Sequence, residues 1–272
     1  MRIIFTVIIF SSLIANAQKN DRTAYLCKYN FDWQKDSTKP SSKFRDIMYL
    51  EIGNSSSKYY SYLKQVGNKN AKQDMANNKP IDFMAENNGR YFPESETEII
   101  ITNFKNGKIK VLDRPGLNAY VYFDSIQKIN WEISEDTLTY LNQTCQKAFC
   151  SFRGRRYTAW FCQSIPYSLG PWLFTGLPGL ILKISDSKGE FVFKCTELIS
   201  KPNELPYCEE YENPTTITKK RLRELKRLKA VDITEFDKID IPGITITYSN
   251  SKGDPIPVKR KPNPYNPIDL SK

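Results

Sequence analysis

The residues that most often do chemistry in proteins are unevenly represented in this chain of 272 residues, which contains six cysteines and no histidine. Without an imidazole, the chain cannot build Ser-His or Cys-His nucleophile pairs or histidine metal sites. No two cysteines have Cys-x-x-Cys spacing, which disfavours zinc. We therefore predict no catalytic residue, no metal site and no cofactor.

Carboxylates are the remaining candidates for acid–base chemistry. Glu132, Glu135 and Asp136 lie close together in the sequence, and a correctly separated carboxylate pair is enough to hydrolyse a glycosidic bond. We expect these acids to lie between strands in an ordinary polar turn, and their spacing is not one that such a reaction requires. A histidine-independent hydrolase is therefore the weakest of three candidate function classes.

The even number of cysteines favours structural disulfides, as in proteins of oxidising compartments. If Gly154-Arg155 is a two-residue hairpin turn, Cys145 and Cys162 share one face within bridging reach, while Cys150 faces the other way. A one-residue slip would reverse this preference. We expect a Cys145–Cys162 disulfide and leave the pairing of the remaining cysteines open: Cys27, Cys150, Cys195 and Cys208.

The N-terminal segment resembles a secretory signal peptide. Arg2 precedes an apolar run from Ile3 to Ile14, and Ala15-Asn16-Ala17 forms an A-x-A cleavage site. The run is shorter than the roughly 20 residues of a membrane-spanning helix. We expect residues 1–17 to be removed before Gln18, leaving a soluble protein in the periplasm or outside the cell.

The net charge of +10 allows acidic partners or an anionic membrane surface. Nucleic acid is not an expected partner, since none of the usual nucleic-acid-binding signatures is present.

The stretch "SLGPWLFTGLPGLILKI", residues 168–184, is apolar like a core strand but carries glycines and prolines like a turn. It must be buried or cover something apolar, because its prolines exclude a single long helix. The candidate ligand-binding residues are Trp172, Leu173, Phe174 and Leu177. The residues expected to shape the turn are Gly170, Pro171, Gly176, Pro178 and Gly179, with Gly179 at a positive φ in a type II turn.

The rest of the chain has the short alternating segments of an antiparallel sheet. We expect one domain over residues 18–272, with a surface loop at 67–90, a basic helix at 215–231 and an extended tail at 250–272. The expected strands are 23–31, 46–52, 58–65, 98–104, 108–112, 119–123, 129–133, 144–153, 157–162, 180–185, 190–198 and 244–248.

The expected basic helix has leucines at every third position, Leu222, Leu225 and Leu228, and Thr215 or Thr216 as its N-cap. Seven basic residues lie between Lys219 and Lys229. This charge indicates either a solvated face or contact with anionic lipid headgroups or an acidic partner.

The segment "TCQKAFCSFRGRRYTAWFCQSIPYSLGPWLFTGLPGLILKI" resembles the signature of the GLPGLI family, exported proteins of uncharacterised function from Bacteroidota. The hexapeptide stands at residues 176–181, and the ending "KRKPNPYNPIDL" is similar to the family's tail. The resemblance implies a mainly β fold with an antiparallel, strongly curved sheet or half-barrel like that of lipoprotein carriers.

Three function classes follow. The first is a periplasmic binding or carrier module for an apolar or amphipathic ligand, such as a lipid or peptide. The second is an accessory protein that binds an envelope component through the basic helix or the tail. The third is the histidine-independent hydrolase.

Overall fold

The computed structural model describes residues 23–39, 41–91, 93, 95–243 and 265–271. The first six strands are β1 (Tyr25–Gln34), β2 (Lys43–Ile52), β3 (Ser56–Ser61), β4 (Ile99–Asn103), β5 (Lys108–Asp113) and β6 (Tyr120–Ser125). The second six are β7 (Trp131–Tyr140), β8 (Gln143–Phe152), β9 (Arg155–Cys162), β10 (Leu180–Asp186), β11 (Phe191–Ser200) and β12 (Thr215–Thr216). The helices are α1 (Tyr62–Ala76), α2 (Ile81–Glu86), α3 (Asn88–Tyr91), α4 (Lys219–Val231) and α5 (Ile233–Asp240).

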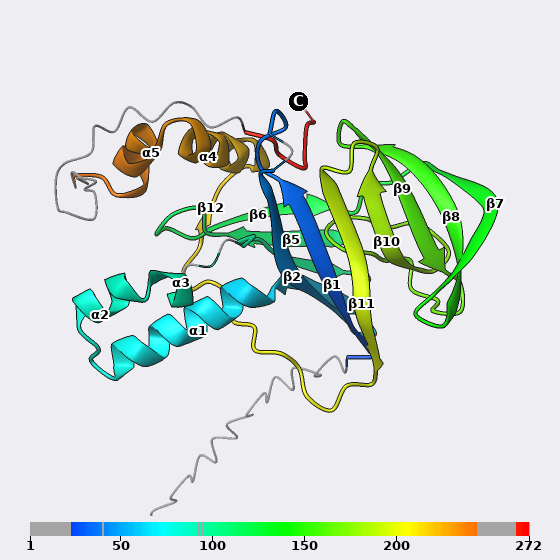
Figure 1. Cartoon of the computed structure of the whole chain (residues 1–272), viewed down its shortest axis with the longest axis horizontal. Coiled ribbons are helices and arrows are strands. Elements are labelled where there is room, and N and C mark those ends of the chain that lie inside the picture. Colours follow the sequence, from blue (N-terminus) through cyan, green and yellow to red (C-terminus); the bar gives the residue numbers. More distant parts are fainter. Residues whose placement is uncertain (1–22, 40, 92, 94, 244–264, 272) are drawn as a thin grey trace, which may run out of the picture.

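All twelve strands belong to one sheet, ordered β12-β6-β5-β4-β3-β2-β1-β11-β10-β9-β8-β7. Every neighbouring pair is antiparallel except the short β12–β6 pair. Strands β7 and β12 lie at the two edges, so the sheet is not closed. The mainly β class is confirmed, and Figure 1 shows two separate helical groups, α1–α3 and α4–α5, beside this sheet.

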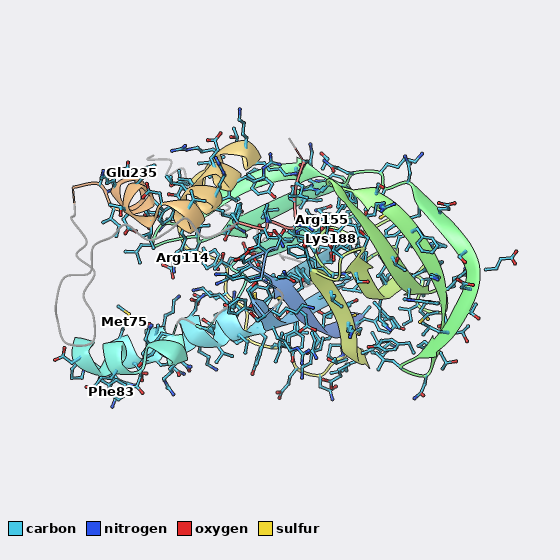
Figure 2. All side chains as sticks on the ribbon, turned by 45° about the horizontal axis from the view of Figure 1, so that its top comes forward. Met75, Phe83, Arg114, Arg155, Lys188 and Glu235 are labelled. Carbon is cyan, nitrogen blue, oxygen red and sulfur yellow. The ribbon has the colours of Figure 1, made fainter. Side chains whose placement is uncertain are left out.

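The expected surface loop at residues 67–90 is wrong, because α1, α2 and α3 occupy most of it. Ser61 caps α1 by accepting a hydrogen bond from the Lys64 amide at 3.0 Å. Polar contacts then hold the helix: the Glu209 amide donates to Gln65 at 3.0 Å, and the Tyr91 hydroxyl donates to Asp74 at 2.8 Å. The helix has no apolar stripe to detect in the sequence, and Met75 at its end projects outward (Figure 2).

The basic helix is present as α4, four residues shorter at its start than expected. Its N-cap is Thr218, whose side chain accepts from the Arg221 amide at 3.1 Å. Thr215 and Thr216 instead pair with β6 as β12. Leu222 and Leu225 are buried, so their leucine spacing marks the face that docks on the sheet.

The β8–β9 hairpin turns at Arg153-Gly154, one position earlier than expected, since Phe152 pairs with Arg155. The pairing of β8 with β9 is therefore shifted by two residues from the expected register. A shift of two leaves each side chain on the face of the sheet where it was expected. Cys145 and Cys162 are therefore neighbours next to the Gln146–Phe161 pair. The expected disulfide is nevertheless absent, and all six cysteines are free thiols.

The sulfur atoms of this cysteine pair are satisfied by other groups. The Cys145 thiol donates to the Gln143 carbonyl oxygen at 3.7 Å, and the Cys162 thiol donates to the Gln143 side-chain oxygen at 3.6 Å. The Cys162 sulfur also lies 2.9 Å from the Ser164 hydroxyl. These contacts turn both sulfur atoms toward hydrogen-bonding groups.

Some expectations lie outside the described residues. These are the signal peptide at 1–17, the strand at 244–248 and most of the tail at 250–272. Across the described part of the chain, no helix combines the length and the apolar character needed to cross a membrane.

Candidate ligand-binding site

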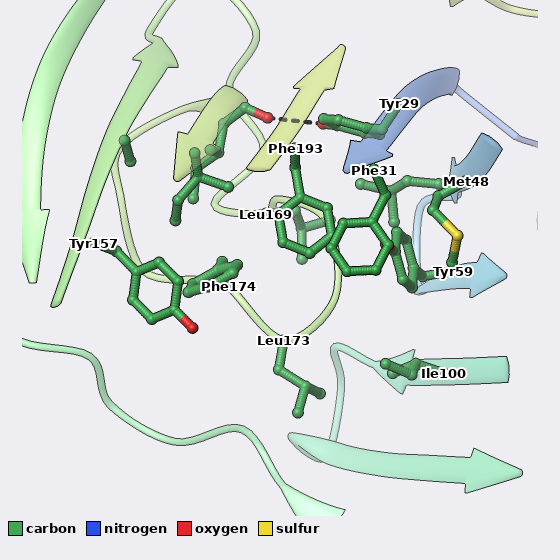
Figure 3. Close-up of a cluster of buried hydrophobic side chains, with 14 of the residues drawn as sticks. Tyr29, Phe31, Met48, Tyr59, Ile100, Tyr157, Leu169, Leu173, Phe174 and Phe193 are labelled. Atoms are coloured by element: carbon green, nitrogen blue, oxygen red, sulfur yellow. Dashed lines mark hydrogen bonds between the residues drawn. The ribbon is translucent and has the colours of Figure 1, made fainter. Parts of the chain in front are cut away.

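The segment between β9 and β10, residues 163–179, fills the centre of the main core. Phe174 and Leu177 are fully buried. The Phe174 ring lies 4.7 Å from Tyr157 and 6.3 Å from Phe193, measured between ring centroids (Figure 3). We call residues 163–179 the core loop. Two of the four residues expected to bind ligand, Phe174 and Leu177, thus belong to the core.

Hydrogen bonds within the core loop and between the loop and β10 fix the shape of the loop. The Ser168 hydroxyl donates to the Leu177 carbonyl at 2.5 Å, and the Ile181 amide donates to the Leu169 carbonyl at 2.9 Å. Gly176 has a φ of +96°, a conformation that favours glycine. These contacts give the core loop one defined conformation, against which the strands pack.

Gly179 has a different role from the expected one. A Cβ atom at this position would lie 2.2 Å from the carbonyl oxygen of Cys162 and 2.6 Å from its carbonyl carbon. At φ +159° the residue is nearly extended and does not occupy a type II turn. Glycine is required here because two backbone segments approach too closely for any side chain.

Trp172 and Leu173, the other two candidate residues, line a large cavity of about 1150 Å³. The core loop also meets Leu50, Ile100 and Ile109 across a gap of only about 10 Å³, too small for more than one water molecule. The loop therefore does two things: it seals the core against β2–β5 and presents Trp172 and Leu173 to the cavity.

The wall formed by the strands is apolar, and the opposite wall is charged. The apolar residues come from β1, β2, β11 and the core loop: Phe31, Trp33, Phe44, Met48, Trp172, Leu173, Phe191 and Phe193. The charged residues come mainly from α4: Lys219, Lys220, Arg223, Glu224, Lys226, Arg227 and Lys229. Residues 265–271 complete the lining, so the cavity combines surfaces suited to the two ends of an amphipathic molecule.

An ion-pair network joins the C-terminal segment to the hairpin turn and α4. The Asp269 carboxylate lies 2.5 Å from Arg153, 3.2 Å from Lys219 and 3.6 Å from Arg223. Asp124 lies 3.4 Å from Arg153 and 3.6 Å from Lys219. Burial disfavours the Asp269 anion, but a hydrogen bond from Ser271 and the charge of Arg153 lower its pKa to about 2.

A second network fixes α4 over β4 and β5. The Lys226 ammonium lies 2.9 Å from Glu98, 3.1 Å from Asp113 and 4.0 Å from Glu96. Burial raises the pKa of Glu96 to about 7; Lys226 opposes this shift and the carboxylates of Glu98, Asp113 and Asp46 reinforce it. One ammonium thus faces several carboxylates, a cluster that the sequence did not suggest.

Arg155 anchors the same C-terminal segment from within the hairpin (Figure 2). Its guanidinium donates to Glu190 at 2.8 Å, to the Asn266 side chain at 2.6 Å and to the Pro267 carbonyl at 2.8 Å. Asn266 also donates to the Gln34 carbonyl at 2.8 Å. Asn266 and Pro267, which close this side of the cavity, are therefore held by part-buried contacts with residues more than 100 positions away in the sequence.

The structure gives no support to cysteine or carboxylate chemistry at the expected positions. Burial raises the pKa of the Cys145 thiol to about 11 and those of Cys150 and Cys195 to about 12, which disfavours the reactive thiolates. Glu132 and Glu135 are exposed on the edge strand β7. Within the described residues, no group of three or more Cys, Asp or Glu is arranged to hold a metal.

A family model described as "Protein of unknown function (Porph_ging)" matches residues 153–183. The match begins at Arg153 in the hairpin turn and ends in β10, so it contains the whole core loop. No curated protein matches the chain.

Two solved structures of PNGF-II, in different crystal forms, are similar in fold. The first is 14% identical and covers 75% of this chain and 32% of its own, with a TM-score of 0.52. The second is 13% identical and covers 74% of this chain and 32% of its own, with a TM-score of 0.50. The chain thus spans about a third of those proteins.

Proposed function

We propose that the protein is a non-enzymatic binding or carrier module that holds an apolar or amphipathic ligand in the cavity beside the core loop. The observation that carries this proposal is the pairing of a cavity of about 1150 Å³ with an apolar wall that includes Trp172 and Leu173. Ligand cavities are typically about 300–1,000 Å³ and mostly apolar, with a few polar groups that orient the ligand. A long hydrocarbon chain suits this space.

The proposal also includes a strongly curved, half-barrel shape of the sheet. The core loop lines gaps against Tyr59 and Ile109 on one half of the sheet, and Phe174 contacts Tyr157 and Phe193 on the other. A sheet that curves around the loop as a half-barrel, like a lipoprotein carrier, accounts for these contacts. Membership of the GLPGLI family and export after removal of residues 1–17 complete the proposal.

Titration with single-chain probes tests the function. Isothermal titration calorimetry with tetradecanol, whose head is uncharged, measures the apolar part of binding alone. We expect saturable binding at one site and a negative heat-capacity change, the sign of buried apolar surface. Absence of binding for both neutral and charged chains would contradict the carrier function.

The second candidate function is an accessory protein that binds an envelope component through the exposed face of α4, where Arg221 lies outside the cavity lining. This surface also allows peripheral contact with an anionic membrane. Pull-down from envelope extracts with and without the Arg221→Glu substitution separates the two candidates, because Arg221 is exposed and does not line the cavity. Loss of a captured envelope protein in the variant, without loss of tetradecanol binding, would favour the accessory function.

A further inference from the structure

Among the residues that the structure describes, the charges at one end of the cavity do not balance. Three cations, Arg153, Lys219 and Arg223, surround the two carboxylates of Asp124 and Asp269. These side chains are between 4% and 30% exposed, so water screens the excess positive charge only partly. With a pKa of about 2, the Asp269 carboxyl is ionised at neutral pH and contributes one negative charge.

Arg153 has hydrogen-bonding capacity to spare at this end. Its side chain is only 4% exposed, and among the described residues its Nε atom has no hydrogen-bond partner. The guanidinium carbon lies 5.5 Å from the centre of the Trp172 ring, so the charged group and the apolar wall meet here. A buried donor without a partner is costly to a folded protein unless something else satisfies it.

Both residues of this contact have an uncommon backbone conformation. Arg153 has a φ of +48° and Trp172 a φ of +55°, a left-handed conformation that is uncommon for residues other than glycine. Strain of this kind persists where the surrounding structure over-determines it and clusters at ligand-binding sites. Arg153 and Trp172 both line the cavity.

From these three observations we infer that the ligand of the cavity carries a single negative charge on oxygen, a carboxylate or a phosphodiester, which binds at the cationic end formed by Arg153, Lys219 and Arg223. The inference rests on the proposed function, because it assigns the head group of the ligand whose chain lies against Trp172. One negative charge balances the excess of one positive charge, and oxygen anions are strong acceptors for guanidinium and ammonium donors.

The probes are three single-chain molecules of equal chain length. Tetradecanoate carries a carboxylate, myristoyl lysophosphatidylglycerol carries a phosphodiester, and tetradecanol carries no charge. We expect both anions to bind at least about tenfold more tightly than the alcohol, which corresponds to about 1.4 kcal/mol. Preference for tetradecanoate identifies a fatty acid as the ligand class, and preference for the lysophospholipid identifies a phospholipid.

Substitution locates the head group. Arg223→Gln removes the excess charge and is expected to weaken binding of the better anion about tenfold while leaving tetradecanol binding unchanged. Asp124→Asn removes one negative charge, which raises the excess from one positive charge to two, and is expected to tighten anion binding. Arg156→Gln is the matched control, because Arg156 is exposed on β9 and does not line the cavity.

The outcomes separate the two proposals. Equal binding of the alcohol and the anions, with no effect of Arg223→Gln, overturns the head-group assignment and leaves the carrier function standing. The assignment also fails if Arg156→Gln weakens anion binding as much as Arg223→Gln does, since that result means a general charge effect. Failure of all three probes to bind overturns both proposals.

Discussion

Replacing Gly179 with alanine tests the close approach that fixes the core loop to the sheet. The added Cβ would lie 2.2 Å from the Cys162 carbonyl oxygen and 2.9 Å from the Gln163 Cα atom. Both neighbours are backbone atoms, so neither can move aside by changing a rotamer. The two segments have to separate by about 1 Å to restore a tolerable contact, at the point where Leu180 pairs with Cys162.

Forced overpacking of a core costs about 1–3 kcal/mol, and the upper value is appropriate because backbone must move. A protein of this size loses about 2–4 °C in Tm per kcal/mol. We therefore expect Gly179→Ala to lower the Tm by about 6–12 °C and to reduce the free energy of unfolding in urea by about 3 kcal/mol.

Two other glycines provide matched controls. Gly189 has a φ of +65° but no atom within 4 Å of an added Cβ, so Gly189→Ala measures left-handed backbone strain alone, about 1 kcal/mol. Gly89 has open space and no positive φ, so Gly89→Ala is expected to be neutral or slightly stabilising. The reasoning fails if Gly179→Ala costs no more than Gly189→Ala in urea unfolding.

Three further outcomes are expected. Burial raises the pKa of Glu96 to about 7, so the folded state binds the proton of the Glu96 carboxyl more tightly than the unfolded state does. The free energy of unfolding should therefore fall as pH rises from about 4.3 to 7. Urea unfolding across this range should show a smaller fall for Glu96→Gln. Trp172→Ala should cost less than the roughly 3–5 kcal/mol of a fully buried aromatic, since one face of Trp172 lines the cavity; a larger loss of unfolding free energy would place Trp172 wholly in the core. The Lys220→Glu/Arg227→Glu double substitution should change the free energy of unfolding by roughly 1 kcal/mol or less, because both residues are exposed; a collapse in Tm would show that this face is buried.

The strands could be predicted from the sequence because burial alternates along them. In β2, for example, Asp46, Met48, Leu50 and Ile52 are buried while the intervening residues are not. The helix α1 could not be predicted in this way, since its buried residues include Gln65 and Asp74, whose partners at Glu209 and Tyr91 are visible only in the folded structure.

In the candidate site, too, local sequence patterns identified some residues, whereas contacts between distant parts of the chain could not be predicted. The unusual composition of the core loop singled out Trp172 and Leu173, which line the cavity, together with Phe174 and Leu177, which do not. All four are apolar, and composition alone cannot distinguish residues that line a cavity from residues that are buried in the core. Asp269 lies 116 residues from its partner Arg153, so no local pattern could have identified that contact.

The position of the ligand chain against the apolar wall is the central claim. Of the four tryptophans, Trp33 and Trp172 line the cavity, whereas Trp131 and Trp160 do not. A single-chain fatty acid brominated along its chain quenches the fluorescence of a tryptophan that it touches. Binding should therefore quench the Trp131→Phe/Trp160→Phe variant strongly and leave the fluorescence of the Trp33→Phe/Trp172→Phe variant unchanged. Undiminished quenching of the Trp33→Phe/Trp172→Phe variant would contradict binding in this cavity.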